Sequence, residues 1–177
     1  YTIGINTFFP INKTMRTIYG RNWRNFSTIL RLPFFKEKTN AYTIAPLITT
    51  RFLSAKGYSI GGNYKTSLSV HQYGIGIEWK WPFKQEKWSI GLEITPLLCD
   101  IETTETCPYI PQENPSTHLG LQGLLNLEWY PKKHLIITSS LSYSYAKFPA
   151  DTSSISYSTY PTNVSGISLG IGLGYKF

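Results

Sequence analysis

The strongest constraint on the fold is a two-residue alternation of apolar and polar side chains that runs through most of the chain. The last twelve residues read GISLGIGLGYKF, with a large apolar residue at every second position from Ile167 to Phe177 and mostly Gly or Ser between them. A period of two places alternate residues on opposite faces of a β-strand. The chain contains eight such runs, at residues 1–9, 24–35, 41–54, 67–81, 88–99, 117–130, 135–147 and 163–177.

The lengths of these runs and of their connections predict one closed barrel over residues 1–177. Strands of globular sheets are usually about 5–6 residues long, whereas a tilted strand needs about 9–11 residues to cross a bilayer, and most of the runs are at least that long. Short connections at 36–40, 82–87 and 131–134 alternate with long ones at 10–23, 55–66, 100–116 and 148–162. This alternation is typical of an antiparallel up-and-down barrel with one plain and one elaborated rim. Within the first long connection, KTMRTIYG is expected to form one or two helical turns.

Two kinds of barrel fit the alternation, and they differ in the solvent that the apolar face meets. A lipocalin-like barrel turns that face inward, whereas a membrane barrel turns it toward lipid. The polar face here is rich in Gly and Ser, which solvate a soluble surface poorly but suit a narrow lumen. Charged residues make up 15% of the chain, against about 25% in typical soluble proteins, and no run of about 18 apolar residues predicts a membrane-spanning helix. These features favour the membrane barrel.

Aromatic residues near the ends of the apolar faces support the same choice. Tyr and Trp favour the two membrane–water interfaces and form girdles around membrane barrels. The predicted girdle, much of it beside the short turns, consists of Tyr42, Trp79, Trp81, Trp88, Trp129 and Tyr130.

The polar faces of the strands carry charges that are expected to meet inside the barrel. The predicted lumen charge network consists of Arg31, Arg51, Glu78, Lys80, Glu93 and Glu128. Isolated charges in a narrow lumen are costly, so we expect them to pair. Eight strands leave an interior only just wide enough for side chains, so the network is predicted to plug the lumen. Pro46 and Pro96 fall in mid-strand and predict a bulge or a local break, because proline cannot donate to the ladder.

The two cysteines, Cys99 and Cys107, bracket the acidic segment CDIETTETC. A metal site requires more ligands at tighter spacing, so neither a metal nor another cofactor is predicted. A disulfide that closes a surface loop is the favoured interpretation, and it implies an oxidising compartment. Two free thiols are the alternative.

The net charge of +7 predicts attraction to anions. Its Lys and Arg residues are scattered and match no nucleic-acid motif, so an anionic lipid surface is the better candidate. The first long loop carries Lys13, Arg16, Arg21 and Arg24. If that loop faces outward, these side chains would meet lipopolysaccharide phosphates or other anions, which Arg binds in a bidentate manner.

The strand number, the alternation of turns and loops, and the terminal GLGYKF resemble the small eight-stranded barrels of the bacterial outer membrane, such as the OmpA transmembrane domain and OmpX. The resemblance implies an integral multi-pass protein of the cell outer membrane of Gram-negative bacteria, with short turns in the periplasm and long loops outside. It also implies that Tyr175 and Phe177 form the signal read by the outer-membrane assembly machinery. Lipid A-modifying enzymes share this scaffold and need a nucleophilic Ser with a positioned His. Although His71, His118 and His134 are present, no motif of those enzymes is found.

The sequence therefore predicts a non-enzymatic outer-membrane barrel with a plugged polar lumen. We expect a structural or interaction protein that is adhesin-like, stabilises the envelope, or serves as an accessory subunit of a larger outer-membrane complex. Its expected partners are outer-membrane lipid and lipopolysaccharide, and no nucleic acid. The alternatives are transport of a small apolar solute, as in proteins of the OmpW type, and modification of lipid A.

Overall fold

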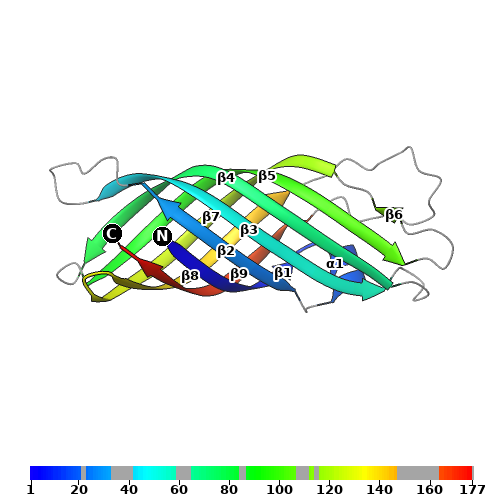
Figure 1. The fold of residues 1–177 in the computed structure, drawn as a ribbon, viewed down its shortest axis with the longest axis horizontal. Coiled ribbons are helices and arrows are strands. Elements are labelled where there is room, and N and C mark those ends of the chain that lie inside the picture. Colours follow the sequence, from blue (N-terminus) through cyan, green and yellow to red (C-terminus); the bar gives the residue numbers. More distant parts are fainter. Residues whose placement is uncertain are drawn as a thin grey trace.

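The computed structural model is a closed barrel of eight antiparallel strands, as the sequence predicts (Figure 1). It describes residues 1–20, 23–32, 42–58, 65–83, 87–106, 112–113, 116–146 and 164–176. The barrel strands are β1 (Thr2–Pro10), β2 (Arg24–Arg31), β3 (Thr43–Tyr58), β4 (Lys65–Phe83), β5 (Trp88–Thr106), β7 (Ser116–Lys132), β8 (Leu135–Ala146) and β9 (Gly166–Tyr175). The two-residue strand β6 (Gln112–Glu113) pairs with the outer end of β5, beyond the last pair between β5 and β7. Among the described residues, no helix is long and apolar enough to cross a membrane.

Pairing between the first and the last strand closes the barrel. The ladder between β1 and β9 runs without interruption from Thr2 opposite Gly174 to Pro10 opposite Gly166. Closure pairs the backbone groups of every barrel strand on both sides, which the hydrocarbon core requires. On β9, Leu169 and Ile171 point outward and are 53% and 72% exposed. The glycines face inward, where a side chain at Gly170 would collide with Asn6.

Strand ends and connections differ from the sequence prediction on several hairpins. β3 and β4 extend toward each other, so residues 59–64 alone link them, whereas the link between β2 and β3 spans residues 32–42. β5 continues to Thr106 through most of the acidic segment that was predicted as a loop. The bounds of these strands therefore differ from the predicted runs, because pairing between β3 and β4 and between β4 and β5 continues past the point where the apolar alternation ends.

Neither mid-strand proline produces a shift of register. Pro46 keeps its place opposite Ile77, so the predicted bulge is wrong there. At Pro96 the ladder between β4 and β5 has a gap between Gly74 and Ile77, with the same register on both sides. That gap is the local break that a missing N–H donor predicts. The register shift in the barrel wall lies instead on β7, between Trp129 and Lys132, where β7 pairs with β8.

The apolar face of the wall changes sides partway along the longer strands. On the membrane part of β4, Ile75 points outward and is 73% exposed, while Gln72 is buried inside. Nearer the outer end, His71 points outward whereas Val70 and Leu68 are buried inside. β3 and β5 change in the same way. We infer that the wall leaves the lipid at this level, because apolar side chains turn toward lipid inside a bilayer and toward a core in water.

A short helix fills the outer mouth of the barrel above this level. Helix α1 (Lys13–Tyr19) begins at Asn12, whose side chain accepts hydrogen bonds from the backbone N–H groups of Thr14 and Met15, a regular N-cap. It lies at the end of the barrel opposite the N- and C-termini (Figure 1). The helix in KTMRTIYG that the sequence predicts is thus confirmed, and it points its apolar face into the barrel.

Candidate functional site

A charged cluster fills the lumen at the end of the short turns, with Arg31 at its centre. The Arg31 guanidinium contacts three carboxylates: Nε lies 2.8 Å from Glu78 Oε2, Nη2 lies 2.6 Å from Glu93 Oε1, and Nη1 lies 3.5 Å from Glu128 Oε1. Arg31 Nη1 also donates to Thr2 Oγ1 at 3.0 Å. The three carboxylates are almost completely buried. One guanidinium therefore holds together side chains from β2, β4, β5 and β7.

Lys80 and several neutral side chains complete this cluster. Lys80 Nζ lies 2.8 Å from Glu128 Oε2 and 3.5 Å from Glu78 Oε2. Asn126 Nδ2 donates to Glu78 Oε1 at 3.0 Å and to Glu93 Oε1 at 2.9 Å. Two cations thus face three carboxylates, and Asn126 adds hydrogen bonds to two of the carboxylates. Such satisfaction of buried charges is what allows them to persist inside a protein.

Arg51 was predicted to join this network, but the structure places it apart. It lies opposite Gln72 in the register, six positions along β4 from Glu78, and it forms no ion pair among the described residues. Its Nε donates to Asn25 Oδ1 at 3.0 Å, and its Nη2 donates to Ser168 Oγ. The Arg51 guanidinium carbon also lies 5.7 Å from the centre of the Phe8 ring. The other five predicted charges do come together.

Between Arg51 and the charged cluster lies a small hollow of about 20 Å³. Its lining includes Asn6, Ser27, Thr138 and Ser140 from three parts of the wall. A volume of this size holds about one water molecule. The hollow itself is therefore too small to serve as an open channel.

The outer mouth is closed by an apolar cap that forms the largest apolar cluster among the described residues. Met15 is completely buried, and the Trp23 ring lies 5.1 Å from that of Phe8 and 5.7 Å from that of Tyr19, in edge-to-face geometry. The members of this apolar cap are Phe8, Met15, Ile18, Tyr19, Trp23, Leu53, Ala55, Leu68, Val70, Leu97, Cys99, Ile101, Ala146 and Val164. Gly57 lets α1 approach β3, because a Cβ there would lie 1.8 Å from the Ile18 carbonyl oxygen.

Basic side chains surround the outside of the apolar cap. Lys13 and Arg16 lie on the exposed side of α1, one turn apart, and Arg24 is exposed at the start of β2. These three residues, called the rim cations below, form no ion pair within 4 Å among the described residues. The fourth predicted member, Arg21, lies outside the described residues. The sequence predicted the residues but not the burial of the helix that carries two of them.

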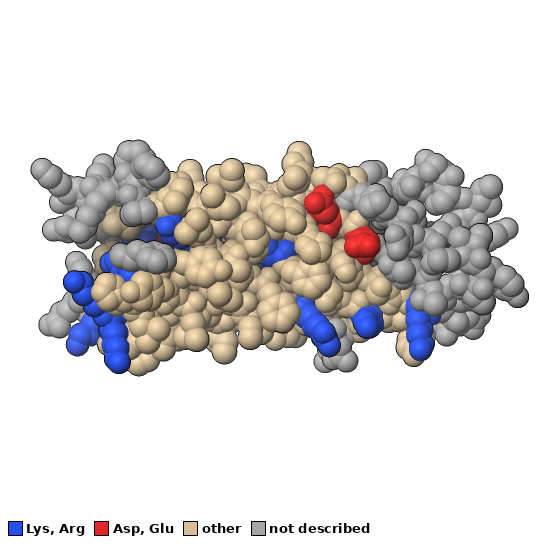
Figure 2. All heavy atoms as spheres, in the orientation of Figure 1, with Lys and Arg blue, Asp and Glu red and all other residues tan. Residues whose placement is uncertain are grey.

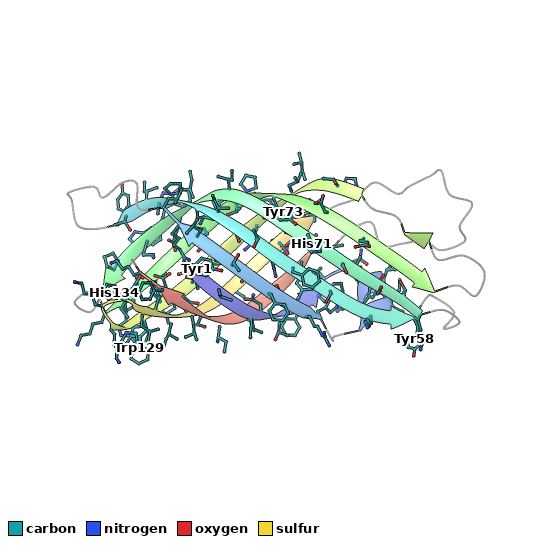
Figure 3. The ribbon with its side chains drawn as sticks, viewed as in Figure 1. Tyr1, Tyr58, His71, Tyr73, Trp129 and His134 are labelled. Atoms are coloured by element: carbon teal, nitrogen blue, oxygen red, sulfur yellow. The ribbon has the colours of Figure 1, made fainter. Side chains whose placement is uncertain are left out.

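The aromatic girdle at the end of the short turns follows the sequence prediction except at one residue. Trp88 stacks with Phe83 and with Trp129, at ring distances of 6.5 and 5.8 Å, and Trp81 and Trp129 are each 39% exposed. Trp79 and Tyr42 are partly exposed. Figure 3 shows Trp129 and His134 at this end and Tyr58 at the other.

Tyr130 is the exception, because it does not lie on the outer face. Its hydroxyl donates to Glu128 Oε2 and lies 3.2 Å from Ser89 Oγ, inside the lumen. Tyr130 is two residues from Glu128, and a period of two places both side chains on the same face. The prediction that Tyr130 belongs to the girdle is therefore wrong.

Of the two cysteines that were predicted to form a disulfide, the structure describes Cys99. It carries a free, buried thiol, and Gln72 Nε2 donates to its sulfur at 3.6 Å. Because β5 continues past Cys99, this residue keeps its inward orientation and joins the apolar cap. Cys107 lies outside the described residues.

The remaining predicted residues lie at dispersed positions. Tyr175 is exposed and stacks on His134 at 5.5 Å, while Phe177 lies outside the described residues. His71 points outward and packs against Phe52 at 4.7 Å, and His118 lies opposite Cys99 in the register. Within the described ranges, no group of three or more His, Cys, Asp or Glu side chains is arranged to hold a metal ion.

Comparison with known proteins supports the fold. No protein-family model and no curated protein sequence matches the chain. Among solved structures, it is similar to Ail, the attachment invasion locus protein of Yersinia pestis, in complex with the heparin analogue sucrose octasulfate. The TM-score is 0.59 at 12% identity, over 99% of this chain and 94% of that chain. Neisserial surface protein A gives a TM-score of 0.54 at 12% identity, with the same coverage.

Both neighbours are small eight-stranded outer-membrane barrels. At this level of identity the likeness concerns the fold. The chain has the fold of an integral, multi-pass β-barrel of the bacterial outer membrane, as the sequence predicts.

Proposed function

We propose that this protein is a non-enzymatic, adhesin-like barrel that binds polyanions at its outer mouth through the rim cations Lys13, Arg16 and Arg24. The observation that carries the proposal is a contrast between the inside and the outside of the same end of the barrel. Inside, the apolar cap fills the mouth, while the charged cluster fills the opposite end. Outside, the rim cations have no carboxylate partner among the described residues.

The chemistry of the rim cations fits sulfate and phosphate groups. Arg binds such oxyanions in a bidentate manner, and Lys adds a compact positive charge. The spacing of Lys13 and Arg16 places both side chains on neighbouring positions of α1, so one extended anion can contact both. The heparin analogue bound to Ail, sucrose octasulfate, belongs to this chemical class. Phosphates of lipopolysaccharide offer the same chemistry from within the membrane.

Binding of sucrose octasulfate to the barrel in zwitterionic nanodiscs tests the proposal. Substitution of Gln for all three rim cations should weaken binding on the order of tenfold, and added salt should weaken binding to the natural protein. The matched control replaces Lys87, Lys132 and Lys133, three exposed residues beside the short turns, and so removes the same charge from the opposite end. Equal losses in both variants would mean attraction by net charge alone and would overturn the proposal.

A second titration distinguishes the two sources of the anion. Titration of sucrose octasulfate in nanodiscs that contain lipopolysaccharide shows whether lipid phosphates already occupy the rim cations. If lipid phosphates are the natural ligand, sucrose octasulfate should bind the natural protein more weakly there than in zwitterionic lipid. If the ligand is a free polyanion, its affinity should be the same in both.

The remaining predicted partners concern other parts of the chain. We propose that the exposed apolar band contacts outer-membrane lipid, as the apolar outer faces of membrane barrels do. We propose that the outer-membrane assembly machinery reads Tyr175 and Phe177 during biogenesis. Association with a larger outer-membrane complex would use the lipid-facing strands or the loops.

A further inference from the structure

The outer ends of β3, β4 and β5 form a wall that rises above the lipid-facing band. β4 and β5 each have 19 residues, whereas about 9–11 are needed to cross the bilayer. On this raised wall most outward positions are polar. On β3, Lys56 precedes Tyr58, which is exposed at the end of the strand. The outward residues Lys65, Ser67 and Ser69 lie on β4, and Asp100 and Glu102 lie on β5.

Charge is divided across the raised wall. Lys56 lies on one flank and Lys65 at the outer end of the middle strand, whereas Asp100 and Glu102 lie on the other flank, with Ser67 and Ser69 between them. Figure 2 shows two acidic side chains near the outer end of the barrel and several basic ones toward the opposite edge of the same view. On the outer face of β5, Asp100 is partly exposed and Glu102 is exposed.

These charges have no ion-pair partner within 4 Å among the described residues. The one hydrogen bond to them from a side chain in the described part of the chain is that from Thr117 Oγ1 to Asp100 Oδ1, at 2.7 Å. Neighbouring strands lie about 4.8 Å apart, so the two flanks are about 10 Å apart and Lys56 does not neutralise Glu102 in the same molecule. Within the described part of the chain, these charges are therefore left for a partner.

Insertion in a membrane limits how two copies can meet. Copies with the same orientation can be related by a two-fold axis along the membrane normal, which preserves the height of every residue and exchanges left and right. Such an axis beside β4 would place the basic flank of each raised wall against the acidic flank of the other, so that two equivalent contacts form. Self-complementarity of this kind defines an isologous interface, and the small serines along the middle allow close approach.

We propose that the raised wall of β3, β4 and β5 binds a second copy of this chain side by side in the membrane, through Lys56 and Lys65 of each copy and Asp100 and Glu102 of the other. Electrostatic complementarity sets the register and excludes like-charged pairings. The surface is separate from Lys13 and Arg16 on α1. Arg24 borders the basic flank on β2 and is left unchanged in the test, so that dimer formation and polyanion binding can fail independently.

Two charge-reversed variants test this pairing. The all-acidic variant carries Lys56→Glu and Lys65→Glu, and the all-basic variant carries Asp100→Lys and Glu102→Lys. Copies with two different affinity tags are folded together into dilute vesicles, extracted in mild detergent and purified through one tag. The fraction of the other tag that is recovered measures association. A control variant, Lys132→Glu with Lys133→Glu, changes exposed charges at the opposite end.

Natural copies should co-purify, and so should copies of the control variant. When both tagged copies carry the same charge-reversed variant, the recovered fraction of the other tag should fall on the order of tenfold, because like charges then face each other. A mixture of the all-acidic and all-basic variants should recover, since every contact in the mixed pair is complementary, and that recovery also shows that both variants are folded. The proposal is overturned if natural copies do not co-purify, if each reversed variant alone still associates, or if the mixture associates no better than either variant alone. Capture of a different protein by the raised wall would appear as one of these failures.

Discussion

Removal of the Arg31 guanidinium should strongly destabilise the barrel. Arg31 contacts Glu78, Glu93 and Glu128 at 2.8, 2.6 and 3.5 Å, and all three carboxylates are almost fully buried. Without it, Lys80 alone faces three carboxylates, and Glu93 keeps only its hydrogen bond from Asn126. Breaking a buried ion pair by removing one partner costs about 3–5 kcal/mol. We expect Arg31→Met to lower the free energy of unfolding by an amount in that range.

A guanidinium chloride titration of the protein folded in lipid vesicles measures this change. Tryptophan fluorescence reports unfolding, and the mobility of unheated samples on a detergent gel reports the folded fraction. The control Lys132→Met removes an exposed cation beside a short turn and should change stability by about 0.5 kcal/mol or less. A second variant, Arg31→Met with Glu93→Gln, returns the cluster to its original net charge and should be more stable than Arg31→Met alone. An Arg31→Met barrel within about 1 kcal/mol of the natural protein would refute the argument.

Three further changes test other parts of the structure. Gly57→Val should displace α1, because a Cβ at this position overlaps the Ile18 carbonyl oxygen. Overpacking of this kind costs about 1–3 kcal/mol, so trypsin should cut at Lys13 and Arg16 faster than in the natural protein, and an unchanged rate would contradict the docking of α1. In a Cys107→Ser variant, the buried thiol of Cys99 should react with a maleimide only after unfolding, and rapid labelling of the folded barrel would place Cys99 outside it. Ile171→Arg, at a position 72% exposed on the lipid side, should lower stability in vesicles by about 2–4 kcal/mol, whereas a neutral effect would mean that this face meets water.

The alternation of side chains was sufficient to predict the barrel, because a period of two reports directly on the two faces of a strand. It identified the inward positions of Arg31, Glu78, Lys80, Glu93 and Glu128, whose side chains then met as expected. The pattern does not give the height of each residue along the barrel axis. Arg51 therefore joined the predicted network although it lies at another level.

The same pattern shows that the two faces differ without showing which solvent each face meets. Above the lipid, the apolar face of β3, β4 and β5 turns inward, and this change of sides was missed. Val70, Leu68 and Ile101 could have indicated it, since each occupies an inward position beyond the apolar outward run. Docking of α1 and the inward orientation of Cys99 depend on that change, and so they could not be predicted before it was known.

A conductance measurement on the purified barrel in a planar bilayer tests whether the lumen is closed. We propose that the charged cluster and the apolar cap close it, so that the protein acts through its outer surface. The inserted barrel should then carry no steady ion current across the voltage range that the bilayer tolerates, while the unheated sample still migrates on a gel as a folded barrel. A stable open conductance from that folded protein would contradict a closed lumen and favour a transport function.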